Sequence, residues 1–252
     1  MNSSSQSASP LIEDRDLHFQ YEDGTKALEG IDFTLHPGES VALLGANGSG
    51  KTTFVLQLNG ILRGQGSITI CGLPLGKDTL PQIRSKIGMV FQDSDEQLFM
   101  PSVLEDVAFG PLNLGLPEAP AIAKAKAALE QAGLAEVWNK APYHLSAGEK
   151  RRVALAGVLA MEPEILVLDE PTTFLDPPAE RNLLQLLSQL PQAKLIVTHN
   201  IRLAAALASR AVFFEKGKLV ATGPVEEIAR RFDWNYSDLA AEDFRYSAQR
   251  RF

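Results

Sequence analysis

A glycine-rich loop between an apolar run and a predicted helix constrains the fold more than any other feature of the 252-residue sequence. The run SVALLG is continuously apolar, which is typical of a parallel-sheet strand buried on both faces. The loop GANGSGKT follows it directly, and Gly45, Gly50, Lys51 and Thr52 satisfy the pattern GxxxxGK(S/T). This order of strand, loop and helix predicts a phosphate-binding loop in an α/β fold.

The residue types of the loop match the chemistry of a triphosphate. Glycines let backbone N–H groups curl around phosphate oxygens, and the helix that follows presents its positive end to them. We expect Lys51 to reach the β- and γ-phosphates and the Thr52 hydroxyl to ligate Mg²⁺. A chance match is the alternative, at about one chain in a hundred of this length. The predicted nucleotide-binding residues are Gly45, Ala46, Asn47, Gly48, Ser49, Gly50, Lys51, Thr52 and Thr53.

Two consecutive carboxylates end another apolar run, EILVLDE. Parallel sheets open their ligand crevice at the carboxyl ends of their strands. We expect Asp169 to support Mg²⁺, and Glu170 to orient and deprotonate the water that attacks the γ-phosphate. A solvated acidic strand end is the alternative.

The flanking sequence predicts two smaller parts beside this core. Upstream, LHFQY and IDFTL are joined by the turn EDGTK and favour two antiparallel strands. Residues 94–146 are rich in Ala, Leu, Glu and Lys and predict a helical insert that prolines break into short pieces. The fold class is therefore α/β, a P-loop NTPase core with a small antiparallel β subdomain and an inserted α-helical subdomain. The prolines are Pro101, Pro111, Pro117, Pro120 and Pro142.

Further core elements follow from apolar patterning. The expected strands are SITICG, KIGMVFQ, EILVLDE and AKLIVTH, and AVFFEKGKLVATG is expected to form a hairpin. The expected helices begin at Lys51 and Gly148 and cover NLLQLLSQL and PVEEIARRF.

Composition limits the cellular setting. The sequence has 24 Lys and Arg against 31 Asp and Glu, so its charge of -7 offers no global attraction for nucleic acid. Its longest apolar run, residues 153–161, is shorter than the ~20 residues of a membrane-spanning helix. The start, MNSSSQSASP, lacks an apolar signal region, and the single cysteine permits no internal disulfide. We expect a cytosolic protein.

Between the two halves of the predicted site, residues 145–157, LSAGEKRRVALAG, resemble the signature sequence of the ABC ATPase family. The resemblance runs from about residue 17 to residue 228. It implies that Tyr21 stacks on adenine, that Gln92 senses Mg²⁺ and the γ-phosphate, and that His199 contacts the γ-phosphate. For Tyr21, an ordinary strand-end tyrosine is the alternative.

Composition and the extent of the resemblance together divide the chain into three parts. Residues 1–10 are expected to be a disordered leader and residues 11–230 the ABC ATPase domain. Residues 231–252 are expected to be a short tail without a further regulatory module.

The resemblance also implies a dimer that closes around ATP. Ser146 and Gly148 resemble the signature positions that reach the γ-phosphate held by a second subunit. The predicted helix cannot fold back onto its own phosphate loop, so ATP would be held between two copies. Ala147 replaces the usual first glycine of the signature and Glu149 its usual glutamine. We expect a working site with weaker ATP affinity.

Residues 90–117 are similar to the energy-coupling factor branch of the family, and an insert of another importer ATPase is the alternative. That branch imports metal ions such as cobalt or nickel, or vitamins. Its ATPases bind, as a homodimer or as two related subunits, to a transmembrane scaffold that works with a substrate-capturing membrane subunit. The resemblance thus implies a peripheral protein on the cytoplasmic face that never touches the transported substrate. The similar positions include Asp95, Gln97, Leu98 and Phe99.

Two other functions compete with transport. One is a soluble ABC ATPase that clamps nucleic acid or the ribosome, and the other is a nucleotide-binding module with little turnover. Such clamps usually carry two cassettes or a long coiled-coil insert, and the acidic balance also disfavours nucleic acid. A module with little turnover would lack Glu170 or His199, and the sequence has both.

Overall fold

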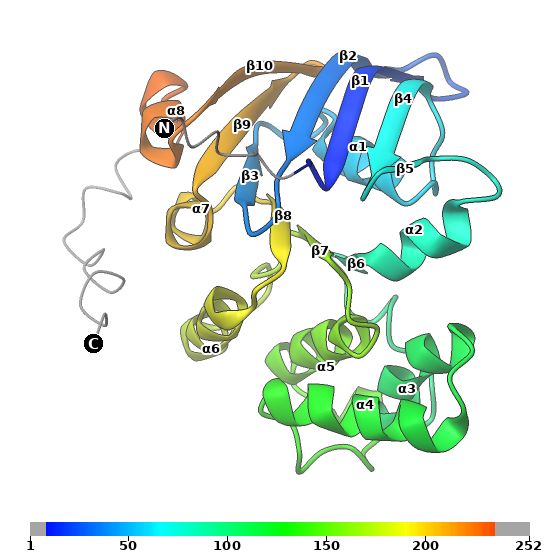
Figure 1. Ribbon diagram of the computed structural model, residues 1–252. Helices are drawn as coiled ribbons and strands as arrows, with labels where there is room; N and C mark the ends of the chain where they lie inside the picture. Colours follow the sequence, from blue (N-terminus) through cyan, green and yellow to red (C-terminus); the bar gives the residue numbers. More distant parts are fainter. Residues whose placement is uncertain (1–8, 235–252) are drawn as a thin grey trace, which may run out of the picture.

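The structure, a computed structural model, describes residues 9–234. The predicted leader, apart from its last two residues, and most of the predicted tail therefore lie outside the described residues. A large, mainly parallel sheet, a smaller antiparallel sheet and a group of helices make up the described part (Figure 1).

The large sheet consists of the apolar runs that the sequence predicts as buried strands. Its order is β10-β9-β3-β8-β7-β6, and all neighbours are parallel except β10 and β9. Each of the inner strands β3, β7 and β8 is buried over nearly its whole length, which explains their unbroken apolar sequences. The strands are β3 (Ser40–Leu44), β6 (Ile87–Val90), β7 (Ile165–Asp169), β8 (Ala193–Val197), β9 (Arg210–Glu215) and β10 (Lys218–Gly223).

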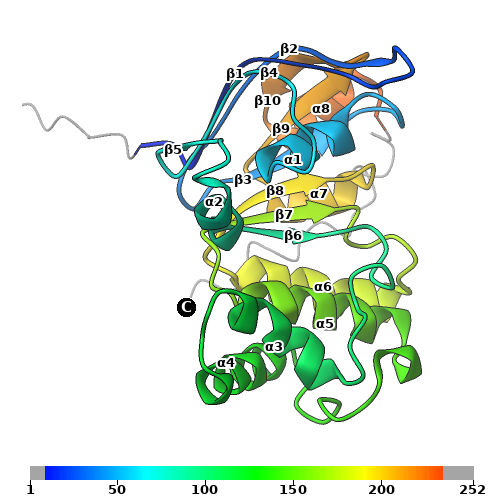
Figure 2. The same cartoon turned by 90° about the vertical axis from the view of Figure 1, so that its right-hand side faces the viewer.

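The small sheet covers the phosphate-loop helix. It has the order β2-β1-β4-β5 and is antiparallel, as predicted for its first two strands. The helix α1 (Lys51–Leu58) lies between the two sheets (Figure 2). Its Phe54 ring packs 5.4 Å from Phe33 of the small sheet and 5.5 Å from Phe214 of the large one, between ring centroids. The strands are β1 (Ile12–Gln20), β2 (Lys26–Leu35), β4 (Gln65–Ile70) and β5 (Leu73–Pro74).

On the other side of the large sheet lie the helices of the predicted insert and the next two helices along the chain (Figure 2). They are α3 (Val103–Asn113), α4 (Glu118–Gln131), the 3-10 turn η1 (Pro142–His144), α5 (Ala147–Leu159) and α6 (Pro177–Gln189). The remaining helices are α2 (Leu80–Lys86), α7 (Ile201–Leu207) and α8 (Val225–Arg231). Within residues 9–234, no helix has the length and apolar character needed to cross a bilayer.

The antiparallel subdomain, the helical part and the α/β core are confirmed, but two prolines do not break helices as predicted. Pro111 lies inside α3, where it is buried, and its missing N–H costs one hydrogen bond of the ladder, but the helix continues for only two more residues. Pro120 is the third residue of α4, where its N–H would have no partner inside the helix anyway. The helices α2 and α7 were not predicted from the sequence.

A carboxylate lies inside the small sheet without compensation. Asp14 in β1 is 0% exposed, and neither of its carboxylate oxygens has a hydrogen-bond partner among the described residues. Its neighbours across the sheet are Phe33 and Ile68. Burial, and to a smaller extent the charge of Glu13, raises the pKa of Asp14 well above its usual value. This residue therefore costs stability.

We predict that Asp14→Val stabilises the protein by about 1–3 kcal/mol at neutral pH, because it removes an unsatisfied buried polar group. The folded wild type keeps a proton that the unfolded chain releases. Its stability therefore falls as the pH rises from the usual carboxyl pKa towards the raised one. The variant should lack this fall. Thermal unfolding followed by circular dichroism at pH 5 and pH 8 measures both effects.

Thr69→Val is the matched control, since it gives a side chain of the same shape at a partly exposed position of the neighbouring strand β4. It should leave the pH dependence of unfolding unchanged. A lower unfolding temperature for Asp14→Val at pH 8 would contradict the prediction.

Candidate nucleotide site

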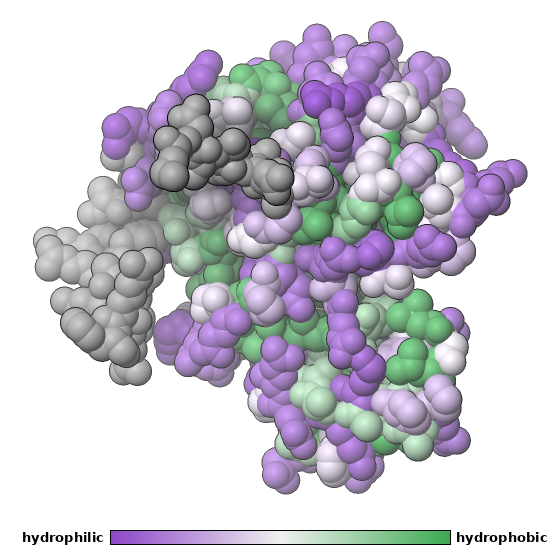
Figure 3. Space-filling model, viewed as in Figure 1, coloured by the Kyte–Doolittle hydropathy of each residue, from purple (hydrophilic) through white to green (hydrophobic). Residues whose placement is uncertain are grey.

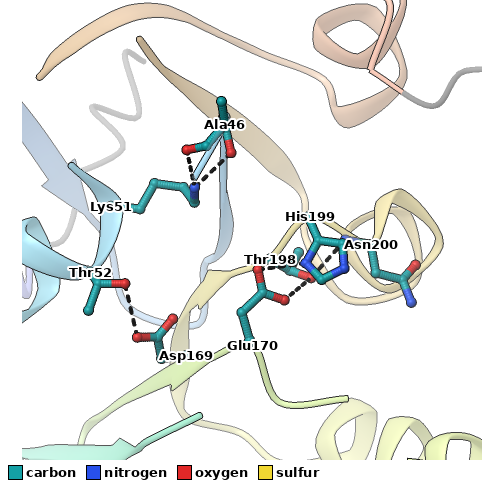
Figure 4. A network of polar contacts seen from close by, with 9 residues as sticks. Ala46, Lys51, Thr52, Asp169, Glu170, Thr198, His199 and Asn200 are labelled. Carbon is teal, nitrogen blue, oxygen red and sulfur yellow. Dashed lines mark hydrogen bonds and ion pairs between the residues drawn. The ribbon is translucent and has the colours of Figure 1, made fainter. Parts of the chain in front are cut away.

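The carboxyl ends of four parallel strands bring the predicted site residues together. The phosphate loop follows β3, and Asp169 and Glu170 end β7. His199 follows β8, and Gln92 follows β6. Because these strands are neighbours in one parallel sheet, their carboxyl ends lie along the same edge. Figure 4 shows the resulting polar network around the phosphate loop.

The phosphate loop is shaped by close backbone packing. A Cβ atom at Gly45 would lie 2.2 Å from the Phe214 carbonyl oxygen, and one at Gly50 would lie 2.4 Å from that of Ala27. Both glycines also have a positive φ, which residues with a side chain rarely adopt. Gly50 caps α1 without a side-chain hydrogen bond, so no side chain competes for the first N–H groups of the helix.

The loop residues have the polar groups that phosphate oxygens require. Lys51 Nζ donates hydrogen bonds to the carbonyl oxygens of Gly45 (2.7 Å) and Ala46 (3.0 Å). Burial lowers the pKa of Lys51, and the carboxylates of Glu170 and Asp169 oppose that change. The buried Ser49 hydroxyl lacks a hydrogen-bond partner within residues 9–234. The loop can thus bind an anion with donors already in place.

Oxygen donors suited to a divalent cation lie beside the loop. The Thr52 hydroxyl donates to Asp169 Oδ2 at 3.2 Å, across 117 residues of sequence. Burial raises the pKa of Asp169, and the hydrogen bond from Thr52 opposes the change. The described residues contain no cluster of three or more His, Cys, Asp or Glu side chains fit for a metal ion. The hydroxyl and the carboxylate fit Mg²⁺, which takes oxygen ligands and binds readily with phosphate oxygens and water.

Glu170 lies in a short network at the same edge. Its Oε1 is 2.9 Å from His199 Nδ1, and its Oε2 accepts a hydrogen bond from the Thr198 hydroxyl at 3.4 Å. A carboxylate only accepts, so Nδ1 of His199 carries the proton in this pair. Glu170 has a φ of 45°. Phe174, four residues later, has a φ of 67° and is 82% exposed. Such strained backbone concentrates at functional sites.

Tyr21 lies next to the loop helix rather than apart from the site. Its hydroxyl is 2.9 Å from Thr53 Oγ1, and its ring packs edge-on against Phe19. Phe19, Tyr21 and Leu62 line an open cavity of about 520 Å³, together with the polar residues Gln20, Glu22 and Asp23. An exposed ring beside a cavity suits a flat heterocycle.

Gln92 is held through its backbone. Arg151 of α5 donates hydrogen bonds from its two terminal guanidinium nitrogens to the carbonyl oxygens of Phe91 and Gln92. Arg151 and Thr198 were not predicted from the sequence, because a basic residue in a helix and a threonine at a strand end carry no signal of their own.

Ser146 and Gly148 are not brought to the phosphate loop. They lie at the exposed N-terminal end of α5, which packs on the opposite side of the large sheet from α1 (Figure 2). The Ser146 hydroxyl donates to Glu149 Oε2 at 2.8 Å, and the Ser146 N–H donates to the same oxygen at 2.8 Å. These hydrogen bonds lower the pKa of Glu149, which favours its negative form. The acid therefore occupies the N–H and the hydroxyl of Ser146 at the end of the helix.

Known proteins resemble this chain in sequence over most of its length. The protein-family profile described as ABC transporter matches residues 28–173. The chain is 52% identical over 219 residues to a putative ABC transporter ATP-binding protein of Geobacter sulfurreducens, which covers 86% of this chain and 88% of that protein. It is 47% identical over 226 residues to the energy-coupling factor transporter ATP-binding protein EcfA of Methanothermobacter thermautotrophicus, over 87% of this chain and 73% of EcfA.

Solved structures agree with the fold. The cbiO1 protein of Clostridium perfringens, part of the ABC transporter complex cbiONQ, superposes with a TM-score of 0.79 at 35% identity. The match covers 91% of this chain and 97% of cbiO1. The ATP-binding cassette MJ0796, in a dimeric post-hydrolysis state with ADP and phosphate, gives a TM-score of 0.76 at 28% identity, over 85% and 98% of the two chains.

We predict that the contact between Tyr21 and Thr53 contributes to nucleotide affinity. Tyr21→Phe and Thr53→Val should each weaken ATP binding by about 2- to 10-fold, the value of one hydrogen bond. Thr53→Val should lose at least as much as Tyr21→Phe, because Thr53 is also a predicted nucleotide-binding residue. The double variant should lose little more than Thr53→Val, because the contact with Tyr21 is already gone. Tyr21→Ala should lose more, since the ring is removed as well. Isothermal titration with ATP measures all four, and fully additive losses would contradict the prediction.

Proposed function

The chain belongs to the ABC transporter family, whose ATPases hydrolyse ATP to drive transport, and we propose that it is the ATPase subunit of an importer of the energy-coupling factor type. The importer takes up a metal ion such as cobalt or nickel, or a vitamin. Similarity to EcfA and to cbiO1, part of the cbiONQ complex, supports the assignment. The observation that carries ATP hydrolysis is the shared sheet edge of Lys51, Asp169 and Glu170.

Each group at that edge has a part in phosphoryl transfer. When ATP binds, its phosphate oxygens replace the carbonyl oxygens that Lys51 now contacts, and the ammonium group stabilises the β- and γ-phosphates. Glu170 orients the attacking water and accepts its proton. His199, which Glu170 orients through a hydrogen bond, contacts the γ-phosphate and helps to hold the transition state. Tyr21 binds the adenine ring.

The metal site of this proposal uses residues from three elements. Thr52 would hold Mg²⁺ through its hydroxyl, Asp169 through its carboxylate and Gln92 through its side-chain oxygen. When bound, the ion neutralises the charge that develops on the β- and γ-phosphates.

A second copy completes the site. Ser146 and Gly148 lie on the opposite side of the large sheet from the loop helix, so we assign them to the ATP held by the facing subunit, in a homodimer or in a heterodimer with a related ATPase. The dimeric state of MJ0796 supports this arrangement. The Glu149 carboxylate accepts from the Ser146 N–H and hydroxyl, so a phosphate that binds the same hydroxyl competes with this acid, which weakens ATP affinity.

We predict that Glu170→Gln traps an ATP-bound dimer, because the substituted amide cannot accept the proton of the attacking water. ATP turnover should fall by at least about 100-fold, in line with loss of a general base. Size-exclusion chromatography with light scattering in saturating Mg-ATP should show a dimer for this variant. The wild type should return to monomers as it hydrolyses ATP.

The control is Glu136→Gln, which alters an exposed carboxylate in the helical part of the chain. It should hydrolyse ATP at the wild-type rate and should not accumulate dimers. If Glu170→Gln stays monomeric in Mg-ATP even in the presence of its membrane partners, the sandwich arrangement is wrong.

An exposed apolar surface offers a place for the membrane partner. We define the α3 patch as Phe99, Phe109, Leu112 and Leu114, all exposed. Phe99, 63% exposed, packs edge-on against Phe109 at 4.9 Å between ring centroids. Hydrophobic side chains gather on the surface of the lobe that holds α3 and α4 (Figure 3). Asp106 accepts hydrogen bonds from the N–H groups of Phe99 and Met100 and so fixes the loop. An apolar helix of the transmembrane scaffold suits this surface.

We predict that Phe99→Glu uncouples transport from ATP binding. Substrate uptake should fall by about 10-fold or more, since a charge at the centre of an apolar interface costs several kcal/mol. The affinity for ATP should be unchanged. Wild-type protein purified from membranes should bring with it a scaffold and a substrate-capturing subunit, and the variant should lose them.

Val220→Glu is the control, because Val220 is an exposed apolar residue of β10 outside the α3 patch. It should keep both uptake and the bound partners. Normal uptake by a stably expressed Phe99→Glu variant would count against the α3 patch. Recovery of the wild type with ribosomes or nucleic acid, without membrane proteins, would instead favour a clamp.

A further inference from the structure

Arg151 is a buried cation without a direct role in binding ATP. It lies in the second turn of α5, is 3% exposed, and places both terminal nitrogens against the carbonyl oxygens of Phe91 and Gln92. The carboxylates of Asp93 and Asp169 are close enough to stabilise its charge. A two-pronged, charge-assisted contact of this kind fixes geometry as well as contributing energy.

A second contact ties the same helix to the same segment. Lys150 Nζ lies 2.5 Å from Asp95 Oδ1, three residues after Gln92. The segment is braced from its own side by Gln97, whose side-chain amide accepts from the Phe91 N–H and donates to the Met89 carbonyl oxygen, both at 3.3 Å. The backbone around Gln92 is therefore held to α5 and to the end of β6, and it must follow when α5 moves.

The N-terminal end of α5 faces a different nucleotide. In the proposed dimer, Ser146 contacts the ATP of the facing subunit, whereas Gln92 contacts the ATP of its own subunit. Ser146 and Arg151 are five residues apart in one helix, roughly 7.5 Å along its axis. The hydrogen bonds between Ser146 and Glu149 stiffen that helix end. A displacement of Ser146 by one ATP thus moves Arg151 by a similar amount.

We propose that Arg151 is a positioning residue that links the two ATP sites of the dimer, by fixing Gln92 of one site to the helix that presents Ser146 to the other. The link rests on the proposed dimer. ATP that is gripped by Ser146 at one site pulls Gln92 into place at the second site, and loss of the γ-phosphate at one site loosens Gln92 at the other. The two sites therefore hydrolyse ATP cooperatively.

A double-mutant cycle tests the first half of this proposal. Arg151→Met removes both donors and keeps a long side chain. In the complex with its membrane partners, kcat should fall by about 10- to 100-fold, as expected when a reacting group is misplaced by about an ångström. The affinity of the isolated chain for ATP should change by less than about 2-fold, because Lys51 and its loop are untouched. In a Gln92→Ala background, Arg151→Met should lower kcat no further, because it acts only through Gln92.

Arg152→Met is the matched control. Arg152 follows Arg151 in the same helix, but its guanidinium contacts the carbonyl oxygens of Gly148, Ala132 and Gly133 and leaves the Gln92 segment untouched. This variant loses comparable hydrogen bonds and should keep the wild-type kcat. Equal losses of kcat in the two variants, or full additivity with Gln92→Ala, would overturn the proposal. Arg151→Lys retains the buried charge but cannot donate to both carbonyl oxygens through a planar guanidinium. It should reproduce the loss of kcat if Arg151→Met folds poorly.

The Hill coefficient for ATP tests the link between sites. It should be clearly above 1 for wild type and Arg152→Met, up to the limit of two that two sites set, and close to 1 for Arg151→Met and Arg151→Lys. An unchanged Hill coefficient above 1 in both Arg151 variants would overturn the link. Failure of the proposed dimer is recognised separately, since Glu170→Gln would then remain monomeric in Mg-ATP.

Discussion

The parallel pairing of β3, β8, β7 and β6 is the constraint on which the rest of the structure depends. Each of these strands is followed by a residue that we propose acts on ATP, and parallel pairing places all four strand ends along one edge. The strands are largely apolar and buried, so the polar groups that can reach a ligand lie at their ends. The hydrogen bond from Thr52 to Asp169 is a direct result of this arrangement.

The two parts of the helix α5 have different surroundings. Its exposed N-terminal end is turned away from the phosphate loop, whereas its buried Arg151 holds the strand end that carries Gln92. In the proposed dimer, one rigid element therefore touches the site of its own subunit and points to that of the facing subunit. A helix is suited to this, because its backbone hydrogen bonds keep its ends in register while the whole element shifts. In the proposed importer, the same lobe carries the α3 patch, so a shift caused by ATP would also reach the membrane partner.

Two acidic residues, Asp14 and Glu149, lie where their charge or burial is unfavourable. Asp14 lies unpaired in an apolar sheet, and nothing in the structure shows a gain from it. Glu149 satisfies the end of α5 with its own charge, at the position where the proposed dimer needs a phosphate. The first cost falls on stability and the second on the affinity of the closed dimer.

The sequence alone determined the phosphate loop, the acidic strand end and the alternation of strands and helices. These features are local, since each depends on a few neighbouring residues and on their period of burial. Only the tertiary structure decided which distant groups meet: Tyr21 with Thr53, Glu170 with His199, and Arg151 with Gln92. Those contacts depend on the order of strands in the sheet, which differs from their order along the chain and follows from packing of the whole core. For the same reason the sequence misjudged Pro111, whose place in α3 is set by burial rather than by its missing N–H.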